Sequence, residues 1–325
     1  MQKVLVSVSH YDTLCREAWD YMERNGCQII FDPSKEFPAY TTEEIEALPD
    51  REDIVAALIG MDDFRDERKY QALPNLKIVV KFGVGVDNID AELAGKYGVK
   101  VLNAPGQNAN AVAELTVGFM IMLMRQITVL HKEVEKGLWP RFMGNELKGK
   151  TVGLLGFGAI ARLTAEKLRS FGVSVTAYDL YPDEEKAQAL GVRMTTQEEV
   201  IQNSDIVSIH IPATPETYHL FDRERISGMK DGAILINPAR GALVDLDALT
   251  EALQSGKLAG AALDAFEVEP LPKDAEILKC KNVVLTPHTG GETREAYYNL
   301  SMATAKNIVR AFSPDSEGST YETFN

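Results

Sequence analysis

Several residue types are scarce in this chain of 325 residues, and each scarcity excludes a class of protein. It has 3 cysteines, Cys15, Cys27 and Cys280, with no C-x-x-C pair and no neighbouring histidine cluster. This pattern predicts buried thiols in a reducing compartment and predicts no metal site. Basic residues number 34 against 48 acidic ones, and the resulting net charge of −14 disfavours nucleic acid and anionic membranes as partners.

Long apolar runs are missing as well. The longest, residues 115–124, is about half of what a membrane-spanning helix requires, so it predicts a core or interface helix. The apolar segment after Lys3 is too short for a secretion signal and predicts a first strand. With 45% hydrophobic and 25% charged residues the composition is globular, and we expect a cytoplasmic protein.

Short β-type runs alternate with helical patterns in the first hundred residues. The predicted strands are 4–8, 28–31, 54–59, 76–81 and 99–102, and the predicted helices are 13–24, 42–48, 66–72 and 91–97. This alternation predicts a parallel sheet with helices on both faces. A last helix, predicted over 293–312, could pack back on this unit.

A second wound sheet is predicted to begin at Thr151, after one long helix over residues 109–130. Its later strands are predicted at 173–178, 206–211, 233–236, 261–263 and 283–286. In open α/β sheets ligands bind beyond the carboxyl ends of the strands, so the residues that follow each strand are the candidates for chemistry.

A glycine-rich turn follows the strand that begins at Thr151 and opens a helical pattern. Gly156 permits a tight turn, and Gly158 lets the backbone approach a pyrophosphate at the positive end of the helix. Ala161 fills the third position of the motif, where a small side chain suffices. Asp179 ends the next strand about twenty residues on, where its carboxylate can accept hydrogen bonds from a ribose diol and repels a 2′-phosphate. The motif predicts a dinucleotide site that favours NAD over NADP.

Polar motifs stand at the predicted ends of three later strands. In chain order they read Asn237-Pro-Ala-Arg240-Gly241, Asp264-Ala-Phe-Glu-Val-Glu269-Pro270 and Pro287-His288-Thr-Gly290-Gly291. With Lys81-Phe-Gly83-Val-Gly85 and Asn103-Ala-Pro-Gly106 they resemble the signature motifs of the D-isomer-specific 2-hydroxyacid dehydrogenases. The likeness runs over nearly the whole chain and is closest to the phosphoglycerate dehydrogenase-like branch, through the segment from Phe142 to Thr151.

The resemblance implies an oxidoreductase that interconverts a D-2-hydroxy acid and its 2-keto acid with NAD. It implies that His288 is the acid/base, that Glu269 orients it and raises its pKa, and that Arg240 clamps the substrate carboxylate. Further substrate contacts are implied at Lys81 and at the backbone amides of Gly83, Val84 and Gly85. Cofactor contacts are implied at Gly156, Gly158, Ala159, Ile160, Asp179, His210, Ile211, Pro212, Pro238, Ala239, Asp264 and Gly290.

The resemblance also implies an architecture of two doubly wound parallel-sheet domains with the site in the cleft between them. Residues 1–103 with 295–325 would form a flavodoxin-like substrate domain, and residues 104–294 a Rossmann NAD-binding domain. A homodimer is implied through the NAD-binding domain, by way of the helix that begins near Asn108. Trp139 and Arg141 are candidates for that contact.

One loop departs from the phosphoglycerate-using relatives, which tend to carry arginine after the third strand. Met61, Asp62 and Asp63 stand there instead, and each acid would repel a phosphate by about 1 kcal/mol or more. Arg65 could compensate. Substrate selectivity is expected in this domain's loops, with Tyr11, Met61, Asp62 and Phe64 as candidates.

Three functions stay open from sequence alone. We favour an NAD-dependent D-2-hydroxyacid dehydrogenase that acts on a small 2-hydroxy or 2-keto acid. The alternatives are an NAD(H)-sensing protein that resembles the family's corepressors and a true 3-phosphoglycerate dehydrogenase.

Overall fold

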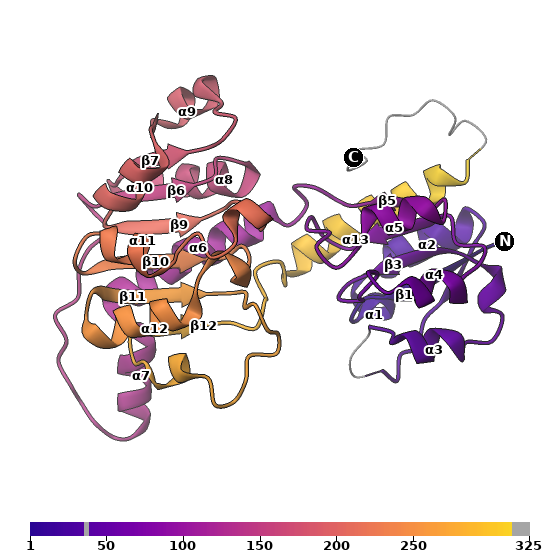
Figure 1. Ribbon diagram of the computed structural model, residues 1–325, viewed down its shortest axis with the longest axis horizontal. Coiled ribbons are helices and arrows are strands. Elements are labelled where there is room, and N and C mark those ends of the chain that lie inside the picture. The colour runs from indigo at the N-terminus through magenta and orange to yellow at the C-terminus, as the bar shows by residue number, and fades with distance from the viewer. Residues whose placement is uncertain (36–38, 314–325) are drawn as a thin grey trace. The chain divides into compact units, whose positions relative to one another are not determined.

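The computed structural model describes residues 1–35 and 39–313. They form two compact units. One unit combines the described residues of Met1–Asn108 with residues 292–313, and the other is Ala109–Gly291. Each unit is built around a parallel sheet (Figure 1). The predicted fold class, α/β with two doubly wound sheets, is confirmed.

The first unit contains a five-stranded sheet in the order β2-β1-β3-β4-β5, with every pair parallel. This is the flavodoxin-like order, in which the chain reverses direction across the sheet between β1 and β3. Its strands are β1 (Gln2–Ser7), β2 (Cys27–Ile30), β3 (Ile54–Ile59), β4 (Ile78–Lys81) and β5 (Lys100–Leu102). Its helices are α1 (Tyr11–Leu14), α2 (Arg16–Arg24), α3 (Thr42–Glu46), α4 (Glu67–Ala72), α5 (Ala91–Lys96) and α13 (Arg294–Ala311).

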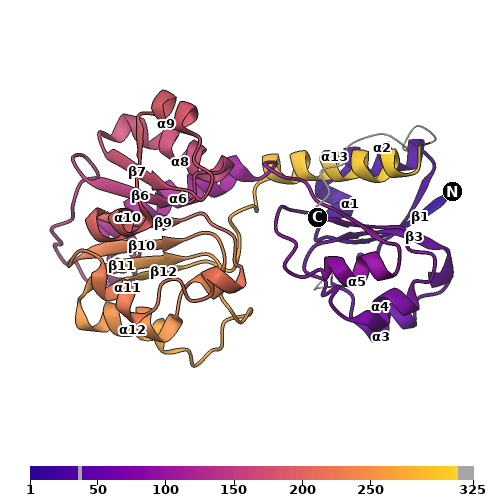
Figure 2. The ribbon, with the colours of Figure 1, turned by 45° about the horizontal axis from the view of Figure 1, so that its top comes forward.

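Both faces of this sheet are buried, because successive side chains of a strand point to opposite sides. Val4 and Val6 of β1 pack in the same core cluster as Met22 of α2 and Ile308 of α13. Leu5 belongs to the opposite cluster, with residues of α3, α4 and α5. Figure 2 shows α2 and α13 on one face of the sheet and α3, α4 and α5 on the other.

The second unit contains a seven-stranded sheet in the order β12-β11-β10-β9-β6-β7-β8, again all parallel. This Rossmann order reverses between β6 and β9. Its strands are β6 (Thr151–Leu155), β7 (Ser174–Tyr178), β8 (Val192–Met194), β9 (Ile206–Ile209), β10 (Ala233–Asn237), β11 (Leu258–Leu263) and β12 (Val283–Leu285). Its helices are α6 (Ala109–Arg125), α7 (Ile127–Glu135), α8 (Ala159–Leu168), α9 (Glu184–Leu190), α10 (Gln197–Asn203), α11 (Arg223–Gly228) and α12 (Leu246–Ser255).

Side-chain alternation divides the second core in the same way. Leu154 of β6 packs in a cluster with α6 and α8, whereas Leu155 packs in the cluster that includes α10, α11 and α12. Strands buried on both faces have no polar side to mark them, which explains why β6 and β10 are continuous apolar runs.

The prediction of one long helix over 109–130 is wrong, because the structure has two helices there, α6 and α7. Gln126 adopts a left-handed conformation with φ 48°, and the chain bends by 63° between α6 and α7. Over the described residues no single helix is long and apolar enough to cross a bilayer, although α6 and α7 together pass that test despite their bend.

Candidate active site

The glycine turn lies between β6 and α8 and has the geometry that a dinucleotide requires. Gly156 has φ +92°, and a Cβ there would lie 2.5 Å from the His210 carbonyl oxygen. At Gly158 an added Cβ would meet nothing within 4 Å, so the space in front of α8 is open. Among the described residues no side chain caps the first turn of α8, and that turn holds no acid. Its amides and its positive end therefore suit a pyrophosphate.

Asp179 lies immediately after β7 and is tied to the glycine turn. Its Oδ2 accepts a hydrogen bond of 2.6 Å from the Phe157 amide, and its Oδ1 accepts one of 2.9 Å from the Tyr181 amide. A surface hollow of about 590 Å³ opens beside it. Asp179, Glu184 and Glu198 all line this hollow. Three carboxylates around one hollow favour a ribose diol over a 2′-phosphate.

We expect Asp179→Asn to weaken the discrimination between NADH and NADPH by about tenfold. The substitution removes one negative charge, worth roughly 1 kcal/mol or more at short range, but keeps an oxygen that can accept from Phe157. The measurement is the ratio of the dissociation constants for the two cofactors. Glu166→Gln, on the exposed side of α8, is the control and should leave the ratio unchanged. An unchanged ratio in Asp179→Asn would remove Asp179 from cofactor selection.

His210 follows β9, next to the glycine turn. Burial lowers the pKa of its imidazole to about 3, so the ring is neutral at physiological pH. Its Nε2 lies 2.9 Å from the Ser208 Oγ, whereas its buried Nδ1 has no hydrogen-bond partner among the described residues. A buried polar atom without a partner is costly, and a bound ligand would satisfy it. His210 therefore fits its predicted place in the cofactor site.

The other predicted cofactor contacts share this edge of the second sheet. Parallel strands direct their carboxyl ends to the same side, and these residues lie in the segments that follow β9, β10 and β12. They are Ile211 and Pro212, Pro238 and Ala239, and Gly290. Ala159 and Ile160 form the first turn of α8. Together with the open glycine turn, this arrangement fits an NAD molecule laid along the edge, and the cofactor contacts predicted at individual residues remain proposals.

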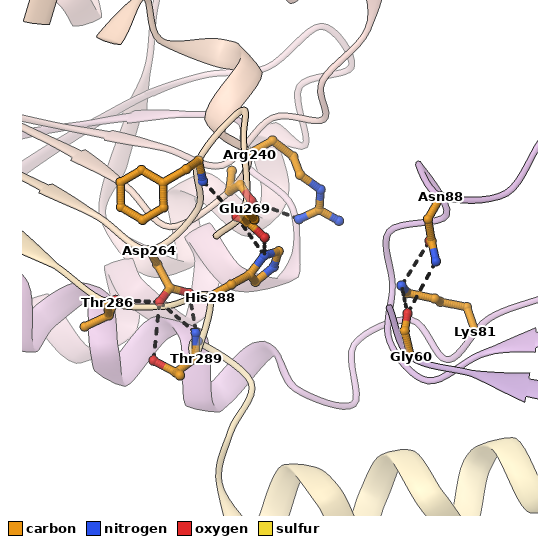
Figure 3. A network of polar contacts seen from close by, with 12 residues as sticks. Gly60, Lys81, Asn88, Arg240, Asp264, Glu269, Thr286, His288 and Thr289 are labelled. Carbon is orange, nitrogen blue, oxygen red and sulfur yellow. Dashed lines mark hydrogen bonds and ion pairs between the residues drawn. The ribbon is translucent and has the colours of Figure 1, made fainter. Parts of the chain in front are cut away.

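His288 and Glu269 form a hydrogen-bonded pair beyond β12 and β11 (Figure 3). The His288 Nδ1 lies 2.9 Å from the Glu269 Oε2 and 3.2 Å from its Oε1. Oε1 also accepts a hydrogen bond of 2.8 Å from the Phe266 amide. Burial opposes ionisation of Glu269, but the bonds from His288 and Phe266 outweigh it and lower the carboxyl pKa. The carboxylate thus leaves the His288 Nε2 available for proton transfer.

A buried carboxylate holds the loop that presents His288. Asp264, 2% exposed, accepts hydrogen bonds from the Thr286 hydroxyl and, at 2.9 Å, from the Thr289 amide (Figure 3). It also accepts one of 2.7 Å from the Gly290 amide. His288 has a left-handed φ of 56°, a strained conformation that persists only when its surroundings enforce it. Asp264 therefore fixes the imidazole through the backbone, and its predicted contact with the cofactor remains a proposal.

The two threonines in this network were missed by the sequence analysis. A signal for Thr286 exists in the register, since Leu263 pairs with Leu285 and so places Asp264 beside Thr286. Reading that signal requires knowing that β11 and β12 are neighbours.

Arg240 follows β10, in a turn packed tightly against the Glu269 loop. The side-chain Nδ2 of Asn237 donates a hydrogen bond of 2.7 Å to the Arg240 carbonyl oxygen, and Arg240 Nη1 donates one of 2.9 Å to the Ala239 carbonyl oxygen. A Cβ on Gly241 would lie 1.9 Å from the Phe266 carbonyl carbon, so only glycine fits there. The charge of Arg240 also contributes to lowering the pKa of Glu269. Arg240, Glu269 and His288 thus come from the ends of three adjacent strands, β10, β11 and β12.

The predicted substrate contacts of the first unit lie at the carboxyl end of β4. Lys81 donates to the Gly60 carbonyl oxygen and, at 3.0 Å, to the Asn88 Oδ1 (Figure 3). Gly83 has a φ of +152°, and the Val84 side chain is 36% exposed. This edge of the first sheet presents a lysine side chain and glycine backbone amides, the groups that a carboxylate-binding site needs. The substrate contacts predicted at Lys81, Gly83, Val84 and Gly85, and the one predicted at Arg240 in the second unit, remain proposals.

The loop after β3, together with Tyr11 of α1, corrects two expectations. Tyr11, Asp62 and Phe64 are at most 2% exposed, so of the four candidate selectivity residues only Met61, 52% exposed, presents its side chain at the surface. The expected repulsion of phosphate is also too large. Asp62 is bonded to the Ser7 hydroxyl and the Tyr40 amide, with a pKa raised by burial, and Asp63 pairs with the Arg65 guanidinium at 2.8 and 2.9 Å.

Comparison with known proteins supports the dehydrogenase resemblance. Residues 117–290, more than half of the chain, match the family model described as "D-isomer specific 2-hydroxyacid dehydrogenase, NAD binding domain". A glyoxylate reductase from Thermofilum pendens is 40% identical over 295 residues, which cover 89% of this chain and 86% of the reductase. A D-3-phosphoglycerate dehydrogenase from Archaeoglobus fulgidus is 39% identical over 309 residues. That match covers 94% of this chain but only 56% of the phosphoglycerate dehydrogenase.

Solved structures with the same architecture include two with close coverage of both chains. The TT0316 protein from Thermus thermophilus has a TM-score of 0.85 and 32% identity, and the match covers 95% of this chain and 96% of that one. D-lactate dehydrogenase from Aquifex aeolicus, in complex with NAD and lactic acid, has a TM-score of 0.80 and 29% identity, with 96% and 95% covered. NAD, predicted from the glycine turn and Asp179, is supported by both the family model and this complex.

Proposed function

Because this chain belongs to the D-isomer specific 2-hydroxyacid dehydrogenase family, we propose that it is an NAD-dependent oxidoreductase that interconverts a D-2-hydroxy acid and its 2-keto acid. The observation that carries the proposal is the Glu269–His288 pair, which lies on the same sheet edge as the Rossmann glycine turn. An imidazole held by a carboxylate can exchange a proton with a hydroxyl or carbonyl oxygen near neutral pH.

Each residue of the site has a separate task in this proposal. NADH, when bound, supplies the hydride that reduces the keto carbon. His288 donates the proton from Nε2 to the carbonyl oxygen, while Glu269 holds the ring through Nδ1 and stabilises its charged form. Arg240 pairs with the substrate carboxylate through its planar guanidinium. In the first unit, Lys81 and the amides of residues 83–85 are the proposed carboxylate-binding groups.

The substrate is proposed to be a small 2-keto acid. Two features support a small substrate: the exposed apolar side chain of Met61, and the absence of a free arginine in the loop after β3, where Arg65 is engaged by Asp63. A similar protein whose length the chain matches closely is a glyoxylate reductase, with 89% of this chain and 86% of the reductase covered.

The decisive experiment is NADH oxidation with a panel of 2-keto acids that includes glyoxylate, pyruvate, hydroxypyruvate and 3-phosphohydroxypyruvate. Saturable turnover with a small member of the panel is expected. A kcat/KM highest for 3-phosphohydroxypyruvate would identify a phosphoglycerate dehydrogenase instead. Binding of NADH without turnover of any member would favour the sensor and contradict the proposal.

A pH profile tests the role given to Glu269. Reduction needs a proton on His288, so we expect kcat/KM to fall as pH rises. Glu269→Gln removes the charge that favours imidazolium, so this falling limb should move to lower pH by roughly one unit. Glu276→Gln, an exposed carboxylate paired with Lys279, is the matched control. A profile that coincides with wild type would deny Glu269 its role.

We also propose a cytoplasmic location and a homodimer formed through the second unit. Free thiols at Cys15, Cys27 and Cys280 support a reducing compartment. Apolar side chains are exposed along α7 and the segment after it, a pattern typical of a protein interface. They are Val134, Leu138, Trp139, Phe142 and Met143.

The dimer proposal predicts that Trp139→Ser combined with Met143→Ser lowers the mass in solution. Trp139 is 80% and Met143 91% exposed, so their replacement should not disturb the core of the second unit. The molar mass measured by light scattering during gel filtration should fall from that of a dimer toward that of a monomer. Replacement of the exposed Leu180 and Tyr181 by serine is the control. A wild-type protein that is already monomeric would contradict the proposal.

A further inference from the structure

A second hydrogen-bonded cluster, Tyr218, His219 and Glu267, lies close to the catalytic pair and takes no part in the reaction described above. The Tyr218 hydroxyl donates a hydrogen bond of 2.8 Å to the Glu267 Oε1, and the His219 Nε2 lies 3.0 Å from the Glu267 Oε2. The Tyr218 and His219 rings stack with centroids 4.0 Å apart and planes at 15°. Both carboxylate oxygens are thus engaged, and the bonds lower the pKa of Glu267, most of all the one from His219. We call these three residues the Glu267 cluster.

The Glu267 cluster joins the loops that follow three strands of the second sheet. Tyr218 and His219 belong to the loop after β9, and Glu267 to the loop after β11. The His219 amide donates 2.8 Å to the Ala242 carbonyl oxygen, in the loop after β10 that carries Arg240. At Gly241 that loop also lies against the backbone of Phe266 and Glu267.

Glu267 and Glu269 belong to the same short loop after β11 and tie it to different partners. Glu267 ties the segment to Tyr218 and His219, and Glu269 ties it to His288. The Phe266 amide, next to Glu267, donates directly to the Glu269 Oε1. A shift of the backbone at Glu267 would therefore move one of the donors that orient the Glu269 carboxylate.

The backbone at His219 is in a left-handed conformation, with φ 47°. A non-glycine residue held in that region costs of order 1–3 kcal/mol and persists where neighbouring contacts enforce it. Two contacts hold His219 in this conformation: the hydrogen bond from its backbone amide to the Ala242 carbonyl oxygen and the contact of its side chain with Glu267. Together they direct the imidazole toward the carboxylate.

We propose that the Glu267 cluster positions the Glu269–His288 pair relative to Arg240, with Glu267 and His219 as positioning residues for proton transfer. Neither residue needs to touch the substrate for this role. The inference rests on the proposed dehydrogenase function for its effect on turnover, but its structural part, the orientation of His288, can be measured without turnover.

The test compares Glu267→Ala with Glu267→Gln. Glutamine keeps an oxygen that accepts from Tyr218 and an amide that can bond His219, whereas alanine removes both contacts. In Glu267→Ala we expect kcat to fall about tenfold, since small displacements of catalytic groups reduce rates steeply, with the KM for NADH and the thermal midpoint close to wild type. In Glu267→Gln we expect kcat within about twofold of wild type.

A second readout is the ¹⁵N NMR spectrum of the His288 imidazole, assigned by its loss in His288→Asn. We expect its chemical shifts to change in Glu267→Ala and to match wild type in Glu267→Gln. Should Glu267→Ala fold poorly, Tyr218→Phe removes only one hydroxyl and should move the same resonances to a smaller extent.

Unchanged His288 resonances in Glu267→Ala would overturn the proposal, as would a loss of kcat shared equally by the alanine and glutamine variants. The two proposals fail separately. A wild-type protein without turnover contradicts the dehydrogenase function, while the resonances of His288 still decide the role of the cluster.

Discussion

Replacement of His288 by asparagine is expected to lower kcat for keto-acid reduction by about 10²–10⁴-fold, the usual contribution of a general acid. Asparagine can still donate a hydrogen bond to Glu269, so the loop after β12 should keep its shape. The asparagine amide cannot transfer a proton at neutral pH, so the substitution removes only the general acid of the chemical step. The measurement is steady-state NADH oxidation, with the NADH dissociation constant from fluorescence alongside.

His131→Asn provides the control for this experiment. His131 lies on α7 and pairs with Glu135 on the exposed surface, at 3.4 Å. Its replacement should leave kcat within about twofold, as surface pairs of this kind contribute little. Near wild-type turnover in His288→Asn would mean that another group donates the proton, and the proposed mechanism would be abandoned.

Loss of the Arg240 guanidinium is expected to have the second largest effect. Arg240→Gln should lower kcat/KM by about 10²-fold or more, because removal of one partner from a hydrogen-bonded charge pair leaves the substrate carboxylate without compensation. Most of the loss should appear as a higher KM for the keto acid, and NADH binding should change little.

Arg240→Lys separates the charge from the shape of the group. Lysine keeps the charge but not the planar fork, so we expect kcat/KM between wild type and glutamine. Arg223→Gln is the control, since Arg223 of α11 forms an exposed ion pair with Glu251 of α12. An unaltered KM for the keto acid in Arg240→Gln would show that Arg240 does not bind the substrate carboxylate.

Much of the fold follows from local patterns. The strand at Ile54–Ile59 and the strand at Thr151–Leu155 were predicted to the residue, since apolar runs bounded by polar or glycine residues mark strands buried on both faces. Strand β8 was missed because its three residues, Val192-Arg193-Met194, include a charged side chain, so no apolar run marks the strand.

The break between α6 and α7 shows a limit of periodicity. The apolar pattern continues past Arg125 into Ile127, so nothing in it predicts a bend. Gln126 breaks the helix by adopting a left-handed φ, a conformation that glutamine rarely takes and that its local sequence does not favour.

The charge of the loop after β3 could not be read from composition. Asp62 and Asp63 are adjacent in the chain, yet one is buried beside Ser7 and the other pairs with Arg65 on the surface. Whether a carboxylate repels a ligand depends on its burial and its partners, and both are properties of the folded chain.

The sequence by itself determined the two wound sheets and the glycine turn with Asp179, and it predicted Arg240, Glu269 and His288 as site residues, because these depend on short patterns at strand ends. Tertiary structure decided how those groups are held: the Asp264 carboxylate beneath the His288 loop, and the Glu267 cluster across three loops. Such contacts join residues from different strands, and only the order of strands in the sheet makes them neighbours.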